Sequence, residues 1–239
     1  MPESPDEAFA RLAVELSETS TIAQTAQQIV AFGMETVHTQ FGGITMLRSR
    51  GRFETVGHSS DVVVDADHHQ LELREGPSVD VSTTSQTITS SDLASDERWP
   101  RWGPVAVSLG LRSVLSAELH AGGQRIGVLT MYGARVRHFT AEDVDVARLF
   151  ARHASAALAA VKLREGLQNA IESRTVIGQA QGVLMERFEV DADRAFAILR
   201  RFSQDGNVKL TDVARRLVET LELPGDVSPC DPSASTGSC

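Results

Sequence analysis

Positions 140–187 read TAEDVDVARLFARHASAALAAVKLREGLQNAIESRTVIGQAQGVLMER. Thr140 and the acids that follow it are typical of a helix start, because a threonine hydroxyl caps free backbone N–H groups and carboxylates complement the helix dipole. After this start only three glycines interrupt the pattern, at positions 166, 178 and 182. We therefore expect one helix over residues 141–187, about 47 residues and roughly 70 Å long. A helix of that length is too long for one small domain, so it should connect two.

Apolar residues recur along this helix at about 3.5 residues, which is the spacing of a coiled-coil seam. Polar residues at positions 153, 174 and 181 make the repeat imperfect. We interpret the segment as a coiled-coil signalling helix that pairs with a second copy of the chain in a homodimer, and the sequence leaves the orientation of the two copies open. The residues predicted to form the dimer seam are Phe150, Ala157, Leu163, Leu167, Ile171 and Ile177.

The chain before the long helix predicts a domain that combines helices with an antiparallel sheet. Apolar residues at helical spacing over 6–38, with a break at 17–21, indicate two helices. Two apolar runs around Gly122-Gly123 are a strong hairpin signal, because adjacent glycines accept the backbone of a tight turn. The segment 62–73 is ambiguous, with a short helix as one interpretation. The expected strands are 43–47, 52–56, 86–89, 113–119 and 125–132.

Two shorter helices are expected after the long one. Asp191 is the predicted N-cap of a helix over 192–204, and Asp205-Gly206-Asn207 is its stop signal. Thr211 is the predicted cap of the last helix. Residues 224–239, rich in Pro, Ser and Asp, are expected to be disordered.

Composition excludes several classes of protein. No run of about 18 apolar residues is present, as a membrane helix would need. The acidic start of the chain lacks the features of a signal peptide, so we expect a cytoplasmic protein. The cysteines, Cys230 and Cys239, lie in the polar tail and form no zinc motif, and the adjacent pair His68-His69 does not face one way and makes a poor metal site. No nucleophile–base constellation and no Walker or Rossmann loop is visible, so an enzyme is not expected.

The distribution of charge limits how the chain can bind a polyanion. The formal net charge of −9 argues mildly against nucleic acid as a partner. Residues 162–223, however, contain ten Lys and Arg and ten Asp and Glu, which balance. Binding of a polyanion by this segment would therefore have to rest on a local basic face rather than on bulk attraction.

The region 167–218 carries a specific pattern. Over all of it, and with the same spacing, the chain resembles the ANTAR family. One position departs from the family, because Gln181 stands where members usually have lysine; the charge is lost, but glutamine can still hydrogen-bond a base or sugar. The residues that carry the resemblance are Leu167, Ala170 and Arg174, then IGQAQGVLM at 177–185, Ala195-Phe196, Leu199-Arg200, Ser203, Asn207, Lys209-Leu210 and Val213-Ala214.

The ANTAR resemblance implies a three-helix output domain that binds paired hexaloop RNA hairpins in nascent transcripts, where binding prevents a terminator from forming. Unpaired loop bases suit such a surface, because a few polar side chains can read their edges. Gly178 and Gly182 lie four apart on one helix and leave room for close approach. Met185 and Phe196 are interpreted as core residues. The predicted RNA-binding residues are Arg174, Gly178, Gln179, Gln181, Gly182, Arg200, Arg201, Ser203, Asn207, Lys209 and Thr211.

Several of these features also fit other interpretations. The glycine pair could instead make a tight helix-packing contact. Gln181 could be a polar residue that sets the register of the seam, and Arg200-Arg201 could simply lie on a solvent-exposed helix face. Two functional alternatives stay open as well. One is a small-molecule-sensing and dimerisation module whose C-terminal helices bind a protein partner. The other is a DNA-binding regulator, since two short helices after a long one can mimic a helix-turn-helix.

Residues 1–160 resemble a GAF domain, which implies an antiparallel sheet with flanking helices and often a small-molecule pocket over one sheet face. Ser78 stands where members often have cysteine, and no cysteine precedes Cys230, which excludes a bilin thioether in this domain. No cofactor is expected, and the identity of any small-molecule ligand is left open. Trp99 and Trp102 are expected to pack a surface loop, with the lining of a ligand pocket as the alternative. The resemblance is carried by Gly76-Pro77, 92–100, 110–116 and 125–129.

We therefore predict an α+β fold with a GAF sensor domain over 1–160, an ANTAR RNA-binding domain over 161–223 whose first helix is continuous with 141–187, and a tail over 224–239. The predicted function is that of a homodimeric RNA-binding regulator of transcription that acts by antitermination. Its expected partners are RNA with two hexaloop stem-loops, a second copy of the chain and, indirectly, the transcription machinery. No membrane contact is expected.

Overall fold

The structure is a computed structural model that describes residues 16, 19, 21–48, 52–84 and 87–222. The chain forms two compact units, Met1–Glu165 and Gly166–Cys239. Most of the predicted first helix, the predicted turn at 48–51 beyond Arg48, and the predicted tail lie outside the described residues.

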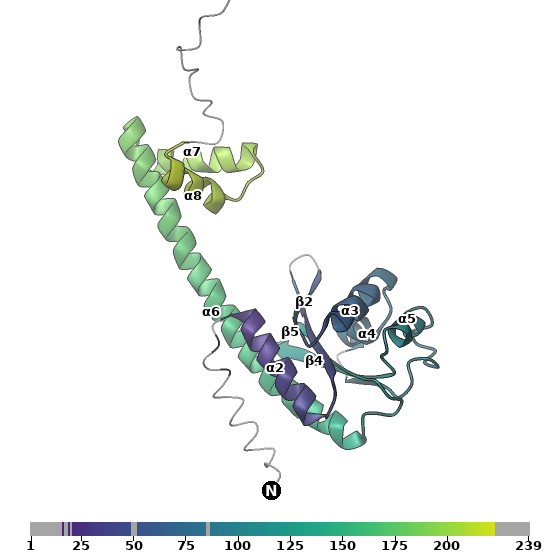
Figure 1. Cartoon of the computed structure of the whole chain (residues 1–239). Helices are drawn as coiled ribbons and strands as arrows, with labels where there is room; N and C mark the ends of the chain where they lie inside the picture. Colours follow the sequence, from purple (N-terminus) through teal and green to yellow (C-terminus); the bar gives the residue numbers. More distant parts are fainter. Residues whose placement is uncertain (1–15, 17–18, 20, 49–51, 85–86, 223–239) are drawn as a thin grey trace, which may run out of the picture. The chain divides into compact units, whose positions relative to one another are not determined.

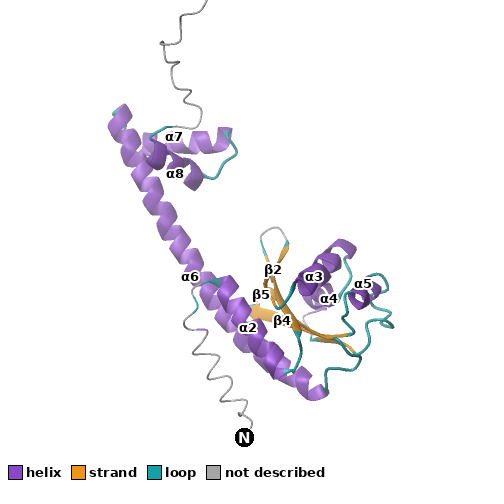
Figure 2. Cartoon of the chain, viewed as in Figure 1, coloured by secondary structure: helices purple, strands orange, loops and turns teal. Residues whose placement is uncertain are grey.

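The first unit is built on a five-stranded antiparallel sheet with the strand order β2-β1-β5-β4-β3 (Figures 1 and 2). Its hairpin β4–β5 turns at Gly122 and Gly123, whose φ angles of 58° and 76° are both positive, as a tight hairpin turn requires. The predicted hairpin is confirmed. The strands are β1 (Phe41–Leu47), β2 (Phe53–His58), β3 (Ile88–Ser90), β4 (Ser113–Ala121) and β5 (Gln124–Gly133).

Helices cover both faces of this sheet. The helix α2 (Ile22–Thr36) and the first part of α6 (Ala141–Phe188) lie on one face, and α3 (Asp61–Leu73), α4 (Pro77–Thr84) and α5 (Trp102–Ser108) lie on the other (Figure 1). The ambiguous segment 62–73 is thus a helix of 13 residues. The start of α6 is as predicted: the N–H of Asp143 donates to Thr140 Oγ1 at 3.2 Å, and the N–H of Thr140 donates back to the Asp143 carboxylate at 2.7 Å.

Phe150 belongs to the core between the sheet and α6. Its side chain is only 2% exposed, and its ring lies 5.2 Å from that of Phe32 on α2. Its assignment to a dimer seam is therefore wrong. Ala157 is partly buried against the same core, so it also packs within its own chain. A heptad pattern marks the apolar side of a helix, but it does not say which surface packs there.

Trp99 and Trp102 form the core on the opposite sheet face. Both are buried, their rings meet edge to face with centroids 5.6 Å apart, and Trp102 Nε1 donates to the carbonyl oxygen of Ala66 at 3.0 Å. Trp99 Nε1 donates to the Asp80 carboxylate at 2.8 Å. The prediction that the two tryptophans pack a surface loop is wrong, because buried indoles need fixed hydrogen-bond acceptors and here find them inside the domain.

The second unit consists of the end of α6 packed with α7 (Ala192–Asp205) and α8 (Leu210–Thr220). The predicted cap of α7 is confirmed, since the Asp191 carboxylate accepts the N–H of Arg194 at 2.8 Å. The predicted cap of α8 is wrong: Lys209 holds the N-cap position without a side-chain bond, and Thr211 lies inside the first turn. The buried core of the unit is Ala180, Leu184, Ala195, Leu199, Val213, Ala214 and Leu217.

The remaining predicted seam residues divide into two kinds. Ile177 is partly buried against the core of the second unit, so only part of its side chain is left for a dimer seam. Leu163, Leu167 and Ile171 are 65%, 59% and 61% exposed. These three large apolar side chains stay available for a partner helix.

Candidate nucleic-acid interface

The end of α6 has a buried side and an open side. Ala180 and Leu184 are fully buried in the core that α6 shares with α7 and α8. Successive helix residues advance by about 100°, which places Gly178 and Gly182 about 160° round the helix from that buried pair. Both glycines are exposed. The glycine pair therefore lies on the side of α6 that faces away from the core of its own unit.

Nothing in the described chain packs on this glycine pair. A methyl group added at Gly178 or Gly182 would meet no heavy atom within 4 Å. The pair is therefore not a packing contact among the helices that the structure describes. It forms a strip of bare backbone where another molecule can approach α6 closely.

Polar side chains lie beside this strip. Arg174 and Gln181 are seven residues apart and so lie on nearly the same line of α6, about two turns from each other. Arg174 is exposed, and Gln181 Nε2 donates to the carbonyl oxygen of Ala192 at 3.0 Å. That bond orients the glutamine and leaves its Oε1 as an acceptor. Gln179 is exposed and lies about 140° round the helix from Arg174, so it flanks the glycine pair from the other edge.

A second group of predicted residues gathers where α7 turns into α8. Ser203 Oγ donates to the carbonyl oxygen of Val208 at 2.7 Å, and the N–H of Val208 donates to the carbonyl oxygen of Ser203 at 3.0 Å. Asn207 has a φ of 48°, which asparagine tolerates better than most residues. These bonds hold the loop in one conformation, so the exposed side chains of Asn207 and Lys209 are carried by a well-defined turn.

Phe196 on α7 is a surface residue, contrary to the sequence prediction. Phe196 is 37% exposed and Met185 is 38% exposed, so the interpretation of both as core residues is wrong. Arg200 lies one helical turn from Phe196 on the same side of α7. An exposed aromatic ring beside a guanidinium is a surface on which an unpaired base can stack.

The basic side chains of both groups are available to phosphate. Within the described residues, Arg174, Arg200 and Lys209 have no ion pair. Arg201 lies 3.5 Å from Asp205, but the two side chains are 82% and 71% exposed. An ion pair that exposed contributes little to stability, so a nucleic-acid phosphate could displace it at little cost.

The two groups of predicted residues do not converge on one patch of a single chain. Arg174, Gly178, Gln181 and Gly182 lie on α6, close to where α7 begins. Arg200, Ser203, Asn207, Lys209 and Thr211 lie around the opposite end of α7, which leads away from α6 (Figure 1). An RNA that contacts both groups therefore has to span the length of α7 or touch two chains.

A buried polar network occupies the sheet face under α3. The Asp67 carboxyl is 3% exposed and accepts bonds from the hydroxyls of Thr45 and Thr55, both at 2.8 Å. Its other oxygen accepts a 3.2 Å bond from Gln70 Nε2 and lies 3.4 Å from the Tyr132 hydroxyl. Burial raises the pKa of Asp67 against the lowering effect of these hydrogen bonds, and burial beside Asp67 raises the pKa of Tyr132.

Ser78, the position where similar domains often carry cysteine, belongs to the same network. Its N–H donates to Gln70 Oε1 at 2.7 Å, and its Oγ lies 3.4 Å from Thr130 Oγ1. The protein's own side chains thus fill this part of the sheet face. No local sequence motif marks Asp67, because its partners Thr45, Thr55 and Tyr132 lie on β1, β2 and β5.

His68 and His69 converge on one carboxylate despite being adjacent on α3. Their Nδ1 atoms lie 3.5 Å and 3.3 Å from the same oxygen of Glu72. The expectation that the pair does not face one way is therefore wrong in geometry. All three side chains lie on the surface, 41% exposed or more, so the cluster has no built pocket to select a metal.

Comparison with protein families identifies both units. A family model described as GAF domain matches residues 19–159, and a second, described as ANTAR domain, matches residues 165–218. The chain belongs to the GAF domain family. It also carries an ANTAR domain, so the predicted combination of the two is confirmed. An ANTAR domain implies RNA-binding regulation by antitermination and a GAF domain implies a sensor, and neither match indicates a catalytic family.

Solved structures support the GAF fold. One is the GAF domain from an Acinetobacter phosphoenolpyruvate-protein phosphotransferase, at 12% identity and a TM-score of 0.55 over 70% of this chain and 99% of that chain. Another is the phycoerythrobilin-bound GAF domain from a cyanobacterial phytochrome, at 10% identity and a TM-score of 0.54 over 69% and 100%. A third is free methionine-R-sulfoxide reductase from Neisseria meningitidis, at 14% identity and a TM-score of 0.50 over 67% and 91%. At these identities the likeness establishes the fold alone.

A comparison with curated protein sequences found no match. Among the helices that the structure describes, none is both long enough and apolar enough to cross a membrane.

Proposed function

We propose that this chain is a cytoplasmic, homodimeric antitermination regulator that binds paired hexaloop hairpins in nascent transcripts. The ANTAR domain makes the RNA contact, the GAF domain receives a signal, and the transcription machinery is reached through the transcript. The observation that carries the proposal is the open glycine strip of α6, which lies inside the segment that matches the ANTAR model.

The glycine strip suits contact with a folded RNA loop. Because Gly178 and Gly182 have no side chain, and no heavy atom lies within 4 Å of where a methyl group would stand, a sugar or base edge can reach the helix backbone. Arg174 beside the strip supplies a charge for phosphate, and Gln181 supplies a hydrogen-bonding group held in place by Ala192. Affinity then comes from local fit, in keeping with the balanced charge of residues 162–223.

The surface of α7 supplies the second kind of contact. Phe196 offers a ring face to an unpaired base, and Arg200 one turn away offers a cation to its phosphate. Asn207 and Lys209 on the fixed turn after α7 extend this contact along the RNA backbone. Gln179 is exposed on the other edge of the glycine strip from Arg174 and stays in the predicted set.

Dimerisation explains how one protein reads two loops. Leu163, Leu167 and Ile171 expose large apolar side chains along α6, and burying them against a second copy removes that surface from water. Each copy then presents one glycine strip and one α7 surface. Phe150 is not part of this seam, because it packs inside its own chain, and Ile177 stays at its edge with a partly buried side chain.

The test is a gel-shift titration of the full chain against an RNA with two hexaloop hairpins. Controls are an RNA with one hairpin and a duplex DNA of equal length. We expect the two-hairpin RNA to bind most tightly and its binding to weaken as salt rises, as phosphate contacts require. Equal binding of the duplex DNA would replace the RNA proposal with DNA regulation. No binding to any nucleic acid would favour a module that binds a protein partner.

A matched pair of variants tests the stacking contact. Phe196→Tyr keeps an aromatic face and should bind the two-hairpin RNA like the wild type. Phe196→Leu keeps an apolar side chain but loses the face, and should weaken binding by about 1–3 kcal/mol, the usual worth of one stacked base. Equal affinity of the two variants would remove Phe196 from the RNA surface.

A further inference from the structure

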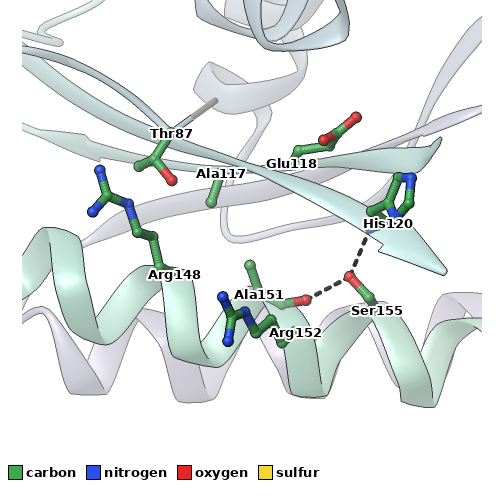
Figure 3. A pocket seen from close by; sticks show the side chains of 8 residues that line it. All are labelled: Thr87, Ala117, Glu118, His120, Arg148, Ala151, Arg152 and Ser155. Carbon is green, nitrogen blue, oxygen red and sulfur yellow. Dashed lines mark hydrogen bonds between the residues drawn. The ribbon is translucent and has the colours of Figure 1, made fainter. Parts of the chain in front are cut away.

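A cavity of about 620 Å³ lies between β4 and α6 in the first unit (Figure 3). It opens on the sheet face that α2 and α6 cover, opposite the face that holds the Asp67 network. Its size is within the range of small-molecule sites. This cavity is therefore separate from the filled space under α3.

The floor of the cavity carries two arginines on one side of α6. Arg148 and Arg152 are four residues apart and so are neighbours on the helix surface, where two like charges repel. Arg148 has one weak contact, 3.4 Å from Asp145 with both side chains exposed. Arg152 has no ion pair among the residues that the structure describes. Asp145 offsets the repulsion between the two guanidinium groups only weakly, because an ion pair with both side chains exposed contributes little.

The acidic residue that lines the cavity does not supply the missing negative charge. Glu118 Oε1 lies 2.5 Å from Arg125 Nε, and this partner neutralises its charge. In Figure 3 the Glu118 carboxylate also points away from α6, whereas Arg148 rises from the helix toward the hydroxyl of Thr87. The lining near α6 is therefore cationic in a protein whose formal net charge is −9.

One end of the cavity is fixed in shape. Ser155 Oγ accepts the N–H of His120 at 2.9 Å and donates to the carbonyl oxygen of Ala151 at 2.5 Å, which ties β4 to α6 (Figure 3). The small side chain of Ala117 faces the helix and leaves room for the apolar part of a ligand. A cavity that is already formed and already charged does not need to reorganise to bind an anion.

A second cavity of about 440 Å³ continues the first along α6 and shares Arg148 with it. Its lining adds Ser91, whose hydroxyl can donate to an anion, and Asp145, the acidic residue that Arg148 contacts. Arg148 thus stands where the two cavities meet, and a ligand longer than a single phosphate can extend on either side of it.

We propose that the cavity between β4 and α6 binds a small organic phosphate, with Arg148 and Arg152 as the groups that hold the phosphate. Guanidinium groups suit this chemistry, because their paired N–H donors match phosphate oxygens. The ligand lies against α6, the same helix that continues into the ANTAR domain as far as Phe188. The proposal concerns binding to the GAF unit and holds whether or not the chain binds RNA.

The test uses inorganic pyrophosphate as the probe, titrated into the full chain without RNA and followed by calorimetry at constant ionic strength. We expect saturable binding by the wild type and a loss of at least tenfold in affinity in Arg148→Ala and in Arg152→Ala. Arg52→Ala is the matched control: Arg52 is an exposed arginine beside β2, at the other edge of the sheet, and its loss should leave binding unchanged.

Four outcomes would overturn the proposal. They are no binding by the wild type at millimolar pyrophosphate, wild-type affinity in both cavity variants, an equal loss in Arg52→Ala, and equal binding of citrate, which would point to any polyanion instead of phosphate. Arg152→Lys, which keeps the charge but not the paired donors, should bind with intermediate affinity. Circular dichroism of each variant must match the wild type, and Arg152→Lys carries the comparison if an alanine variant does not fold.

Discussion

Replacement of Gly178 and Gly182 by alanine should raise stability and lower RNA affinity at the same time. Both positions are exposed, lie inside α6 and have no heavy atom within 4 Å of an added methyl group. Alanine is favoured over glycine in an exposed helix interior by about 1 kcal/mol. The free energy of unfolding of the second unit should therefore rise by about 1 kcal/mol for each change and about 2 kcal/mol for both.

The effect on RNA has the opposite sign. If RNA contacts the bare backbone at the glycine strip, two added methyl groups force it outward, at a cost of about 1–3 kcal/mol. That cost is roughly a five- to 150-fold loss of affinity. Gly166→Ala is the matched control, because Gly166 lies on the same helix and also has no neighbour within 4 Å. It should gain the same stability and keep the affinity of the wild type.

Two measurements check this prediction on the full chain: scanning calorimetry for the unfolding transition and a gel shift with the two-hairpin RNA. In a unit of this size, 1 kcal/mol moves the unfolding midpoint by about 4–8 °C. Lower stability in the double variant would refute the open geometry of the strip. Higher stability with unchanged RNA affinity would refute close approach of RNA to Gly178 and Gly182.

Three other changes test other parts of the structure. Asp67→Ala leaves the hydroxyls of Thr45 and Thr55 without their acceptor and should lower the free energy of unfolding in urea by about 2–6 kcal/mol; Asp67→Asn should lose less, and equal losses would contradict the network. The hydrogen bond from Arg98 lowers the pKa of Asp96 from 3.8 to about 2, so the ionised Asp96 stabilises the fold at neutral pH, and this stabilisation should be lost as pH falls from about 4 to about 2. Asp96→Asn should remove that part of the acid unfolding profile, and identical profiles for the variant and the wild type would contradict the prediction. Replacing both Leu167 and Ile171 by serine should convert a dimer to a monomer in light scattering, because these side chains are 59% and 61% exposed in the single chain, and an unchanged mass would exclude them from the seam.

Sequence patterns predicted the features that depend on neighbouring residues. Thr140 and Asp191 cap helices by hydrogen bonds to residues three positions away, and the turn at Gly122-Gly123 depends on the backbone conformation of the two glycines themselves. The continuity of α6 follows in the same way from the lack of a stop signal after Thr140. The motif at 177–185 identified the candidate site, because the spacing of its residues along one helix survives folding unchanged.

Features that depend on distant partners were not predictable. Phe150 fits a heptad seam equally well whether its partner is another chain or Phe32, and only the fold makes Phe32 the partner. The period of α7 places Phe196 near its apolar side, but the small core of the second unit buries Ala195 and Leu199 and leaves the ring at the surface. No sequence pattern indicated the role of Asp67, since the strands that carry its hydrogen-bond partners come together only in the folded sheet.

The hydrogen-bond network around Asp67 also limits the affinity with which a small molecule could bind in the space under α3. The molecule would have to bind a minor conformation in which Asp67 has released its partners. Breaking these four hydrogen bonds, three buried and one partly buried, costs about 1 kcal/mol each, so about one molecule in a thousand would adopt that conformation. Measured affinity falls by the same factor, so a compound with roughly nanomolar fit to the open form would bind at roughly micromolar concentration. Screening for the signal of this domain should therefore run at high ligand concentration, or on Asp67→Ala, in which the open form is more populated.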